Sequence, residues 1–202
     1  ELRVGFEDDH LTVRQHERLR SLVPSNVELV AVGGLVEAER AVKEPAELDA
    51  IRAAAAVADE ALREILEGGL TGRTERSVAR ALEDAMRDRG AEPSFPSIVA
   101  SAEHGALPHA VPRDEPIAAR TLVTIDWGAL LDGYCSDCTR TFATGDLPGE
   151  LVALYDVVER AQAEALAAVR PGPLGKEVDS VARDIIERAG HGEHFGHGLG
   201  HG

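Results

Sequence analysis

The stretch that decides the fold is LVTIDWGALLDGYCSDCTRTFA, which runs from Leu122 to Ala143. At its centre, Asp132-Gly133 is a strong signal for a two-residue turn between antiparallel strands. Apolar and β-branched residues on either side of the turn predict the strands themselves, at 122–131 and 134–143. The stretch therefore predicts a β-hairpin.

The turn also determines which residues of the hairpin face one another. If Leu131 pairs with Tyr134, then Asp126 lies opposite Thr139, and Asp137 lies two residues along from Thr139 on the same face. The two aspartates are then diagonal neighbours, roughly 7–8 Å apart. Carboxylates in such positions repel each other unless a cation lies between them, so this arrangement predicts a metal site. The alternative is that both aspartates lie on the surface of an ordinary hairpin.

The final segment, FGHGLGHG at residues 195–202, is a candidate for the same site. Its alternating glycines suggest a strand that another group approaches closely. His201 in this segment would add an imidazole ligand to the two carboxylates. A solvated tail rich in glycine and histidine is the alternative interpretation.

Two cysteines, Cys135 and Cys138, raise the possibility of a redox or zinc site. Their separation is an odd number of residues, so in a regular strand their side chains point to opposite faces and cannot form a disulfide or bind one ion together. There is no second cysteine pair to complete a tetrahedral zinc site. We therefore predict two thiols in a core strand.

These features resemble the creatinase/prolidase/methionine aminopeptidase superfamily (peptidase M24, pita-bread fold), and within it the Xaa-Pro peptidases, aminopeptidase P and prolidase. The resemblance extends from about residue 37 to the end, and residues 1–35 resemble the end of the smaller N-terminal domain of those enzymes. The segments that carry the resemblance are Phe95–Ser101, Ala106–Ala110, Ile125–Gly128, Gly133–Asp137, Thr139–Phe142 and His197–Gly202.

The resemblance implies an α+β fold in which duplicated helix-helix-strand units surround a curved antiparallel sheet. Residues 36–202 would form this pita-bread catalytic domain with an incomplete second half, and residues 1–35 would be the remnant of a small α/β N-terminal domain. Helices are expected from Pro45 to the glycines at 68 and 69, from a Thr74 cap to near Gly90, from Leu151 to Val169, and up to Gly190. Their apolar stripes are expected to be core, and residues 1–32 read as strand, helix, strand.

The resemblance also implies roles for individual residues. Asp126 matches the aspartate that binds one ion of a two-metal centre, Asp137 the aspartate that bridges both ions, and His201 the histidine on the other ion. His109 and His197 match histidines that contact the substrate or the tetrahedral intermediate. Two divalent ions, manganese foremost with cobalt or zinc as alternatives, would hold a bridging hydroxide that attacks the peptide carbonyl.

The sequence departs from the family pattern at its end, because two further glutamate ligands are expected after His201 and the sequence stops at Gly202. With three of five ligands, the 202 residues alone are expected to be inactive, and we expect the natural chain to continue. An internal repeat supports this expectation, since residues 77–80, Ser-Val-Ala-Arg, recur at 180–183. A second ligand-bearing hairpin is then expected beyond the second copy.

Composition limits the possible partners. A formal charge of −15 argues against nucleic acid. The sequence shows neither a bilayer-spanning apolar stretch nor a leader, so we expect no membrane partner and a cytoplasmic protein. A homodimer is expected only by analogy with the family.

The function that these observations favour is hydrolysis of the bond between an N-terminal residue and proline, with a peptide carrying proline at its second position as substrate. The sequence does not separate aminopeptidase from dipeptidase action. The alternative function is that of a catalytically silent pita-bread domain that binds proteins or peptides. The presence of Asp126, Asp137 and His201 together argues against that alternative, because a silent domain has no chemical reason to keep them.

Overall fold

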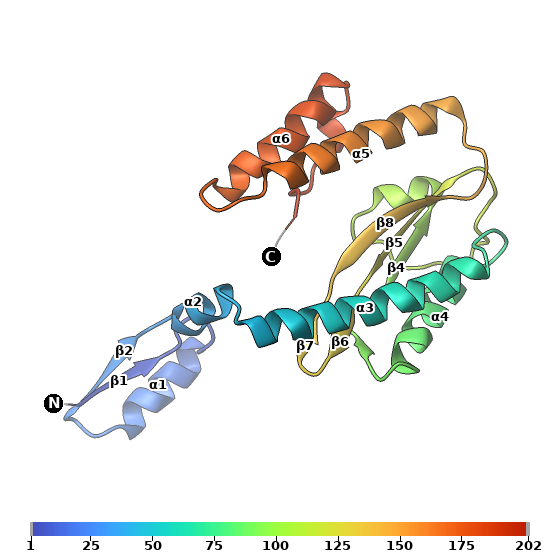
Figure 1. Cartoon of the computed structure of the whole chain (residues 1–202). Coiled ribbons are helices and arrows are strands. Elements are labelled where there is room, and N and C mark those ends of the chain that lie inside the picture. Colours follow the sequence, from blue (N-terminus) through green and yellow to red (C-terminus); the bar gives the residue numbers. More distant parts are fainter. Residues whose placement is uncertain (1, 201–202) are drawn as a thin grey trace. The chain divides into compact units, whose positions relative to one another are not determined.

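The computed structural model describes residues 2–200 and contains both helices and antiparallel and parallel strands (Figure 1). The chain forms two compact units, one ending at Ala50 and the other beginning at Ile51. The domain boundary expected at residue 36 stays a prediction. Among the residues that the structure describes, no helix is both long and apolar enough to cross a membrane.

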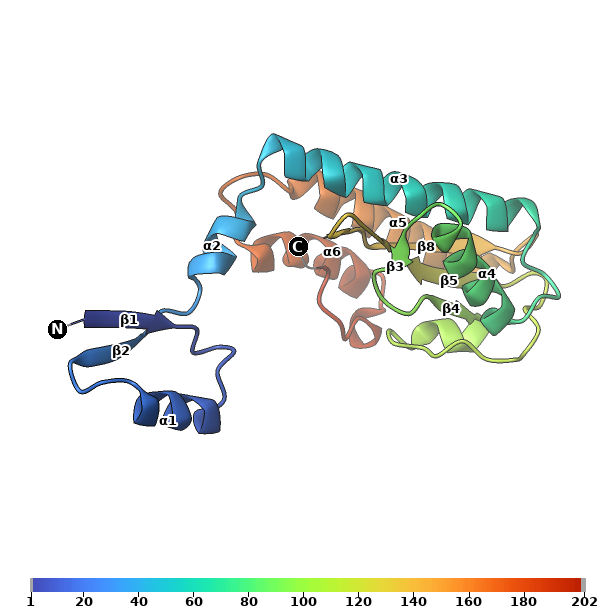
Figure 2. The same ribbon diagram turned by 90° about the horizontal axis from the view of Figure 1, so that it is seen from below.

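The first unit contains a βαβ motif followed by a short helix, as Figure 2 shows. Strands β1 (Leu2–Phe6) and β2 (Val27–Ala31) pair in parallel, and α1 (Val13–Leu22) connects them. The strand-helix-strand order expected for residues 1–32 is therefore confirmed. The segment that follows β2 contains a further helix, α2 (Leu35–Ala41), which begins directly after Gly34 in the left-handed conformation.

Among the described residues of the second unit, 51–200, six short strands form two three-stranded sheets, with the orders β3-β6-β7 and β4-β5-β8. The strands are β3 (Glu92–Pro93), β4 (Ile98–Ser101), β5 (Leu122–Trp127), β6 (Ala129–Leu131), β7 (Tyr134–Cys135) and β8 (Cys138–Ala143). Two 3₁₀ turns, η1 (Ala102–Ala106) and η2 (Gly192–His194), lie in the connections.

The hairpin register agrees with the prediction. Leu131 pairs with Tyr134, and Asp126 pairs with Thr139. Asp132 and Gly133 both have positive φ, 49° and 84°, as a two-residue hairpin turn of the I′ kind requires.

The two long strands of the prediction are each interrupted, however, which the sequence pattern does not reveal. The interruption lies at Gly128, where an added Cβ would collide with the carbonyl oxygen of Ser136. Ser94 also contacts this point of the hairpin, because its hydroxyl donates a hydrogen bond of 2.8 Å to the same Ser136 carbonyl. The pair before the interruption is Trp127 with Cys138, and the pair after it is Leu130 with Cys135. Two residues separate these pairs on each strand, so the register is unchanged across the interruption.

The main core lies between one face of the β4-β5-β8 sheet and the helices α3 (Pro45–Glu67) and α4 (Glu75–Arg87) (Figure 1). Val123, Ile125 and Trp127 alternate along β5 and are buried on that face. The Trp127 indole N–H donates to the carbonyl of Ala58 in α3 at 2.9 Å. Because side chains alternate along a strand, Asp126 belongs to the opposite face of the sheet.

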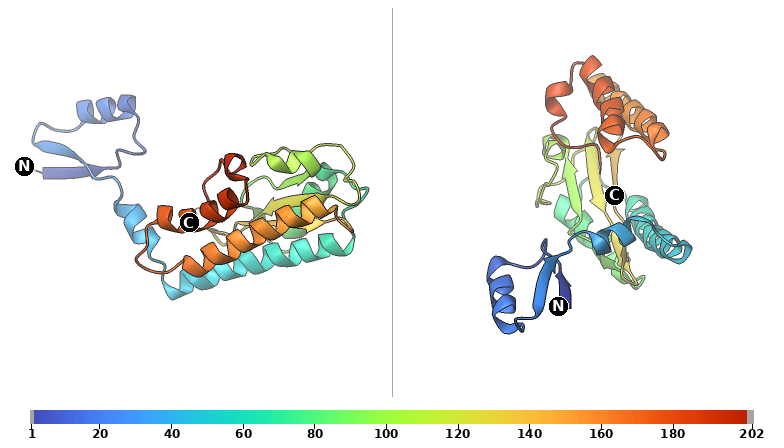
Figure 3. Two further views of the ribbon diagram at one scale, coloured as in Figure 1. Left: turned by 90° about the horizontal axis from the view of Figure 1, so that it is seen from above. Right: turned by 90° about the vertical axis from the view of Figure 1, so that its left-hand side faces the viewer.

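A second helix pair, α5 (Gly149–Ala168) and α6 (Gly175–Arg188), forms its own small core (Figures 1 and 3). The buried side chains of this core are Ala161, Ala165, Ala182, Ile185 and Ile186. Helices were expected at all four places, and all four form. The two copies of the repeated motif lie in α4 and α6, the second helix of each pair.

Candidate active site

Asp126 lies near the end of β5, half-buried on the sheet face that points away from α3 and α4. Its cross-strand partner Thr139 donates a hydroxyl hydrogen bond of 2.7 Å to its Oδ1. A carboxylate fixed in this way keeps lone pairs for another cation or donor. Asp126 is thus oriented by the same register that the Asp132-Gly133 turn determines.

Asp137 lies in the two-residue segment between β7 and β8, and its side chain is exposed. Because the register is unchanged across the interruption, this segment lies across the hairpin from Gly128 and close in sequence to Thr139. Asp126 on β5 and Asp137 in the segment between β7 and β8 provide the hard oxygen ligands that divalent ions such as manganese prefer. The chemistry of these donors therefore fits the expected metal centre.

The third expected ligand, His201, lies outside the described residues. Within residues 2–200, the structure contains no group of three or more His, Cys, Asp or Glu side chains that could hold a metal ion. The assignment of Asp126, Asp137 and His201 as ligands stays a prediction.

The structure brings together the two histidines that were expected to contact substrate. The rings of His109 and His197 lie 5.9 Å apart between centroids, in an edge-to-face arrangement with an interplanar angle of 74°. Both side chains are exposed. The His197 Nδ1 lies 2.8 Å from the carbonyl of Gly198, which can only accept, so Nδ1 carries the hydrogen and Nε2 is left as an acceptor in the neutral ring. Their catalytic roles stay predictions.

His109 lies in a segment that is organised by Glu75, a residue that sequence reasoning missed. Glu75 is the first residue of α4, and its side chain is completely buried. Burial by itself would raise the pKa of Glu75, but hydrogen bonds from the Arg113 side chain, from the backbone of Ser101 and Arg113, and from the Ser101 hydroxyl lower this pKa to about 2. Glu75 is therefore ionised in the folded protein at neutral pH.

His104, in the same segment as His109, is directed to Glu75. Its Nδ1 lies 2.8 Å from Glu75 Oε2, and its side chain is only 9 % exposed. An ionised carboxylate only accepts hydrogen bonds, so the His104 Nδ1 is the donor. This histidine has a structural partner in the described chain.

The segment that carries His197 is held by a different charged group, the pair Asp179–Arg183 in α6. Arg183 donates two hydrogen bonds to Asp179, of 2.7 and 3.0 Å, and also donates to the carbonyls of Phe195 (2.7 Å) and His197 (3.2 Å). Asp179 accepts from the Leu199 amide at 2.9 Å. The hydrogen bonds from Arg183 and Leu199 lower the pKa of Asp179. Arg183 belongs to the repeated Ser-Val-Ala-Arg motif, which was the only sequence signal for this pair.

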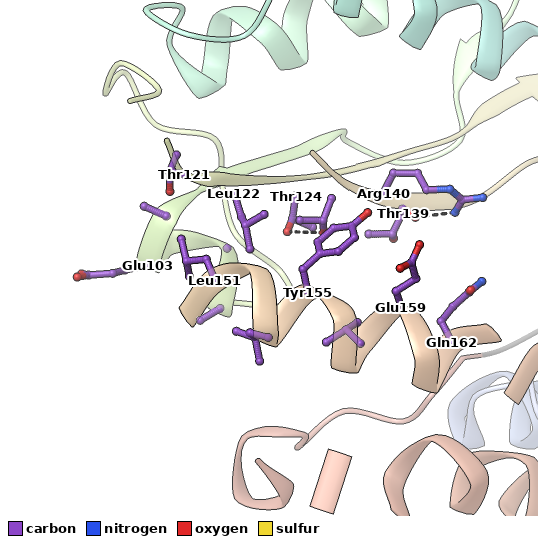
Figure 4. A pocket seen from close by; sticks show the side chains of 16 residues that line it. Glu103, Thr121, Leu122, Thr124, Thr139, Arg140, Leu151, Tyr155, Glu159 and Gln162 are labelled. Carbon is purple, nitrogen blue, oxygen red and sulfur yellow. Dashed lines mark hydrogen bonds between the residues drawn. The ribbon is translucent and has the colours of Figure 1, made fainter. Parts of the chain in front are cut away.

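A pocket of about 880 Å³ opens between α5 and the sheet face that carries Asp126 (Figure 4). Thr139, which holds Asp126, lines it, and Tyr155 and Glu159 point from α5 towards the strands. The apolar stripe of α5 was expected to be core, but this expectation is wrong in part. Leu154 and Val158 line the pocket and are 37 % and 51 % exposed.

The two cysteines, both within the described chain, form no disulfide. Cys138 packs against the main core, and burial raises the pKa of its thiol. Cys135 is exposed, so the prediction that it is a core thiol is wrong. The reason is the alternation of side chains along the hairpin: Cys138 faces the main core, so the unchanged register puts Cys135 on the opposite face, paired with the exposed Leu130.

Comparison with known proteins defines the class. Residues 49–202 match metallopeptidase family M24, and residues 1–42 match the creatinase/prolidase N-terminal domain. The chain is 43 % identical over 201 residues to an uncharacterized peptidase of Bacillus subtilis, YqhT, covering 99 % of this chain and 57 % of that protein. It is 41 % identical over 180 residues to a Xaa-Pro dipeptidase of Pyrococcus furiosus, covering 88 % of this chain and 52 % of the relative.

Solved structures give the same result for the fold. A Xaa-Pro dipeptidase from Bacillus anthracis superposes with a TM-score of 0.93 at 39 % identity, covering all of this chain and 56 % of that one. An X-Pro aminopeptidase from Thermotoga maritima superposes with a TM-score of 0.87 at 31 % identity, covering 95 % of this chain and 55 % of that one. The chain thus spans little more than half the length of these relatives.

The fold and the sequence matches define a metallopeptidase-type chain with the pita-bread architecture, which confirms the expected fold class. The chain belongs to metallopeptidase family M24.

Proposed function

We propose that the protein is a metal-dependent peptidase that hydrolyses the bond between an N-terminal residue and proline. The observation that carries the proposal is the pairing of His109 with His197, whose exposed rings come together from segments far apart in the sequence. Relatives described as Xaa-Pro dipeptidases and an X-Pro aminopeptidase support the choice of substrate.

Asp126, Asp137 and His201 would hold two divalent metal ions, with manganese expected first and cobalt or zinc as alternatives. Such ions, when bound, lower the pKa of a coordinated water and stabilise negative charge that develops on a carbonyl oxygen. Membership of a metallopeptidase family supports divalent ions in general, without identifying them. Thr139 would keep the Asp126 carboxylate turned towards the ion by occupying its Oδ1.

His109 and His197 would bind the substrate and the intermediate. An imidazole can donate to a carbonyl oxygen or accept from an amide, and two rings in edge-to-face contact restrict each other's orientation. Because His197 Nδ1 is used by the Gly198 carbonyl, its Nε2 is the atom that would meet the substrate.

The proposal is tested with the natural full-length protein, supplied with manganese, on Ala-Pro, Ala-Ala and Ala-Pro-Ala. Release of alanine from Ala-Pro but not from Ala-Ala supports Xaa-Pro specificity, and cleavage of Ala-Pro-Ala distinguishes aminopeptidase from dipeptidase action. Removal of the metal by a chelator should abolish hydrolysis, and added manganese should restore it. Hydrolysis of neither proline peptide would overturn the proposal. Binding of these peptides without cleavage would support the alternative of a silent binding domain.

A homodimer and a cytoplasmic location stay predictions of the sequence.

A further inference from the structure

We propose that Glu75 is a positioning residue, which holds the segment from Ser101 to Arg113 in the shape that presents His109 to His197. The inference rests on the proposed function only in its effect on catalysis. Its structural part, the placement of His109 against His197, can be tested without any substrate.

The two oxygens of Glu75 accept six short contacts from this segment. Oε1 accepts from the Ser101 amide at 2.8 Å, from the Ser101 hydroxyl at 2.9 Å and from Arg113 Nη2 at 3.3 Å. Oε2 accepts from His104 Nδ1 at 2.8 Å, from the Arg113 amide at 3.0 Å and from Arg113 Nε at 3.3 Å. One carboxylate therefore fixes both ends of the segment and a point within it.

The part of the segment that contains His109 has little other support. Of the described residues 102–109, none is buried. The chain continues through two turns, in which the Leu107 amide donates to the His104 carbonyl at 3.1 Å and the Ala110 amide donates to the Leu107 carbonyl at 3.2 Å. His104 is thus the link between the Glu75 carboxylate and the turn that precedes His109. Because apolar packing holds little of this part between the buried residues Ser101 and Ala110, its shape depends largely on hydrogen bonds.

The chemistry of the Glu75 position argues for a specific role. A buried carboxylate is costly unless its charge is compensated, and an apolar side chain often packs equally well in such a place. A carboxylate is distinctive in that it accepts several hydrogen bonds on both oxygens and donates none. The six donors around Glu75 require that property, because a neutral amide would direct its own N–H groups at some of them.

The test is the Glu75→Gln variant of the natural full-length protein, with Asp114→Asn as the matched control. Asp114 is in the same region and pairs with Arg76, but it is 74 % exposed, so its loss should have little effect. With ¹³C-labelled histidine, nuclear Overhauser contacts between the His109 and His197 rings should be lost in Glu75→Gln and kept in Asp114→Asn. The indole N–H signal of Trp127, which donates to the Ala58 carbonyl in the main core, shows in each variant that the core is intact.

In the catalytic assay, kcat for Ala-Pro should fall about tenfold or more in Glu75→Gln while KM changes less, because a misplaced side chain costs most in the transition state. If Glu75→Gln fails to fold, Arg113→Gln removes part of the same network from a side chain that is 41 % exposed, and it should give a smaller loss of ring contacts in the same direction.

Unchanged ring contacts and unchanged kcat in a folded Glu75→Gln protein would overturn the inference. Should the wild-type protein cleave no proline peptide, the proposed function fails. The loss of ring contacts in Glu75→Gln would still support the positioning role in that case.

Discussion

At the scale of single residues, Glu75 shows how hydrogen bonds can outweigh burial. Its pKa of about 2 lies below the usual 4.5, so the folded state holds a proton less tightly than the unfolded state does. The resulting stabilisation is complete at pH values above the unfolded pKa and is lost as the pH falls towards 2. The difference between the folded and unfolded pKa values of Glu75 corresponds to about 3 kcal/mol of folding stability at neutral pH.

This difference predicts the acid stability of the protein. Between pH 5 and pH 2, the free energy of unfolding should fall less steeply with pH in Glu75→Gln than in the wild type, although the variant starts from a lower stability at pH 7. Urea unfolding at a series of pH values measures both slopes. Glu92→Gln is the control, because Glu92 pairs with Arg87 but is 70 % exposed. Equal slopes in the wild type and Glu75→Gln would contradict the lowered pKa.

Thr139 offers a second test at this scale, because its hydroxyl orients Asp126 at 2.7 Å. Thr139→Val keeps the shape of the side chain and removes that donor. If Asp126 is a metal ligand, manganese affinity of the full-length protein should fall by about 10–100-fold, the usual effect of losing a partner of a ligand. Thr141→Val is the matched control, since Thr141 shares a hydroxyl contact of 3.2 Å with Thr124 on the same strand pair. Titration calorimetry measures the manganese affinity of both variants and of the wild type. An affinity of Thr139→Val equal to that of the wild type would show that Thr139 does not support a metal ligand.

At the scale of elements, the hairpin depends on one glycine. In Gly128→Ala, the added Cβ meets the Ser136 carbonyl and the Ser94 hydroxyl, which are themselves hydrogen-bonded. Overpacking of this kind costs about 1–3 kcal/mol, which urea unfolding would detect. Gly149→Ala is the control, because a Cβ there meets nothing within 4 Å among the described residues. If Gly128→Ala were as stable as the wild type, the two strands could move apart at Gly128 and Ser136 without a loss of folding free energy.

The Asp179–Arg183 pair in α6 offers a comparable test in Arg183→Lys. A lysine keeps the charge beside Asp179 but cannot donate to Asp179, Phe195 and His197 together, because it lacks the planar fork of arginine. The Leu199 amide, which donates to Asp179, should then exchange its hydrogen faster by about tenfold, since local opening becomes easier.

Arg188→Lys is the matched control for this experiment. Arg188 forms an exposed pair with Asp184 four residues away on the same helix, and it should leave the exchange of Leu199 unchanged. If both variants behave alike, Arg183 does not hold the segment of His197.

The elements also show what the sequence could predict. Local signals were sufficient for the hairpin, because Asp132-Gly133 sets the register of its neighbours and therefore the pairing of Asp126 with Thr139. The role of Glu75 was not predictable, because its partners Ser101 and Arg113 lie 26 and 38 residues away in the sequence, and no periodic pattern marks such a contact. Periodicity also misled for α5, because an apolar stripe looks the same whether it faces a core or a pocket.

At the scale of the whole molecule, the repeated motif relates two helix pairs with different surroundings. In the first pair, α3 and α4 cover the sheet that carries Asp126, and in the second pair, α5 and α6 pack on each other. Each second helix supplies the charged group that holds a histidine-bearing segment, Glu75 in α4 and Asp179–Arg183 in α6. The contact between His109 and His197 therefore depends on both halves of the repeat.

Metal binding is expected to distinguish residues that hold the metal ions, such as Asp137, from residues that contact the substrate, such as His109. A metal ion that binds only the folded state raises the free energy of unfolding by about 2.7 kcal/mol at a hundredfold excess over its Kd. In the full-length protein, Asp137→Ala should lose this manganese-dependent stabilisation together with hydrolysis of Ala-Pro. His109→Ala should keep the stabilisation and lose only turnover, because a side chain that contacts the substrate does not hold the ion.

Thermal unfolding with and without manganese, followed by a chelator, distinguishes these outcomes. Asp132→Asn serves as the control, since this exposed aspartate lies in the turn of the same hairpin and should retain both properties. If Asp137→Ala still gained stability from manganese and cleaved Ala-Pro at the wild-type rate, the bridging role would be wrong. If His109→Ala lost the stabilisation, the imidazole would have to be placed on the metal, and the role of Glu75 would become that of holding a ligand.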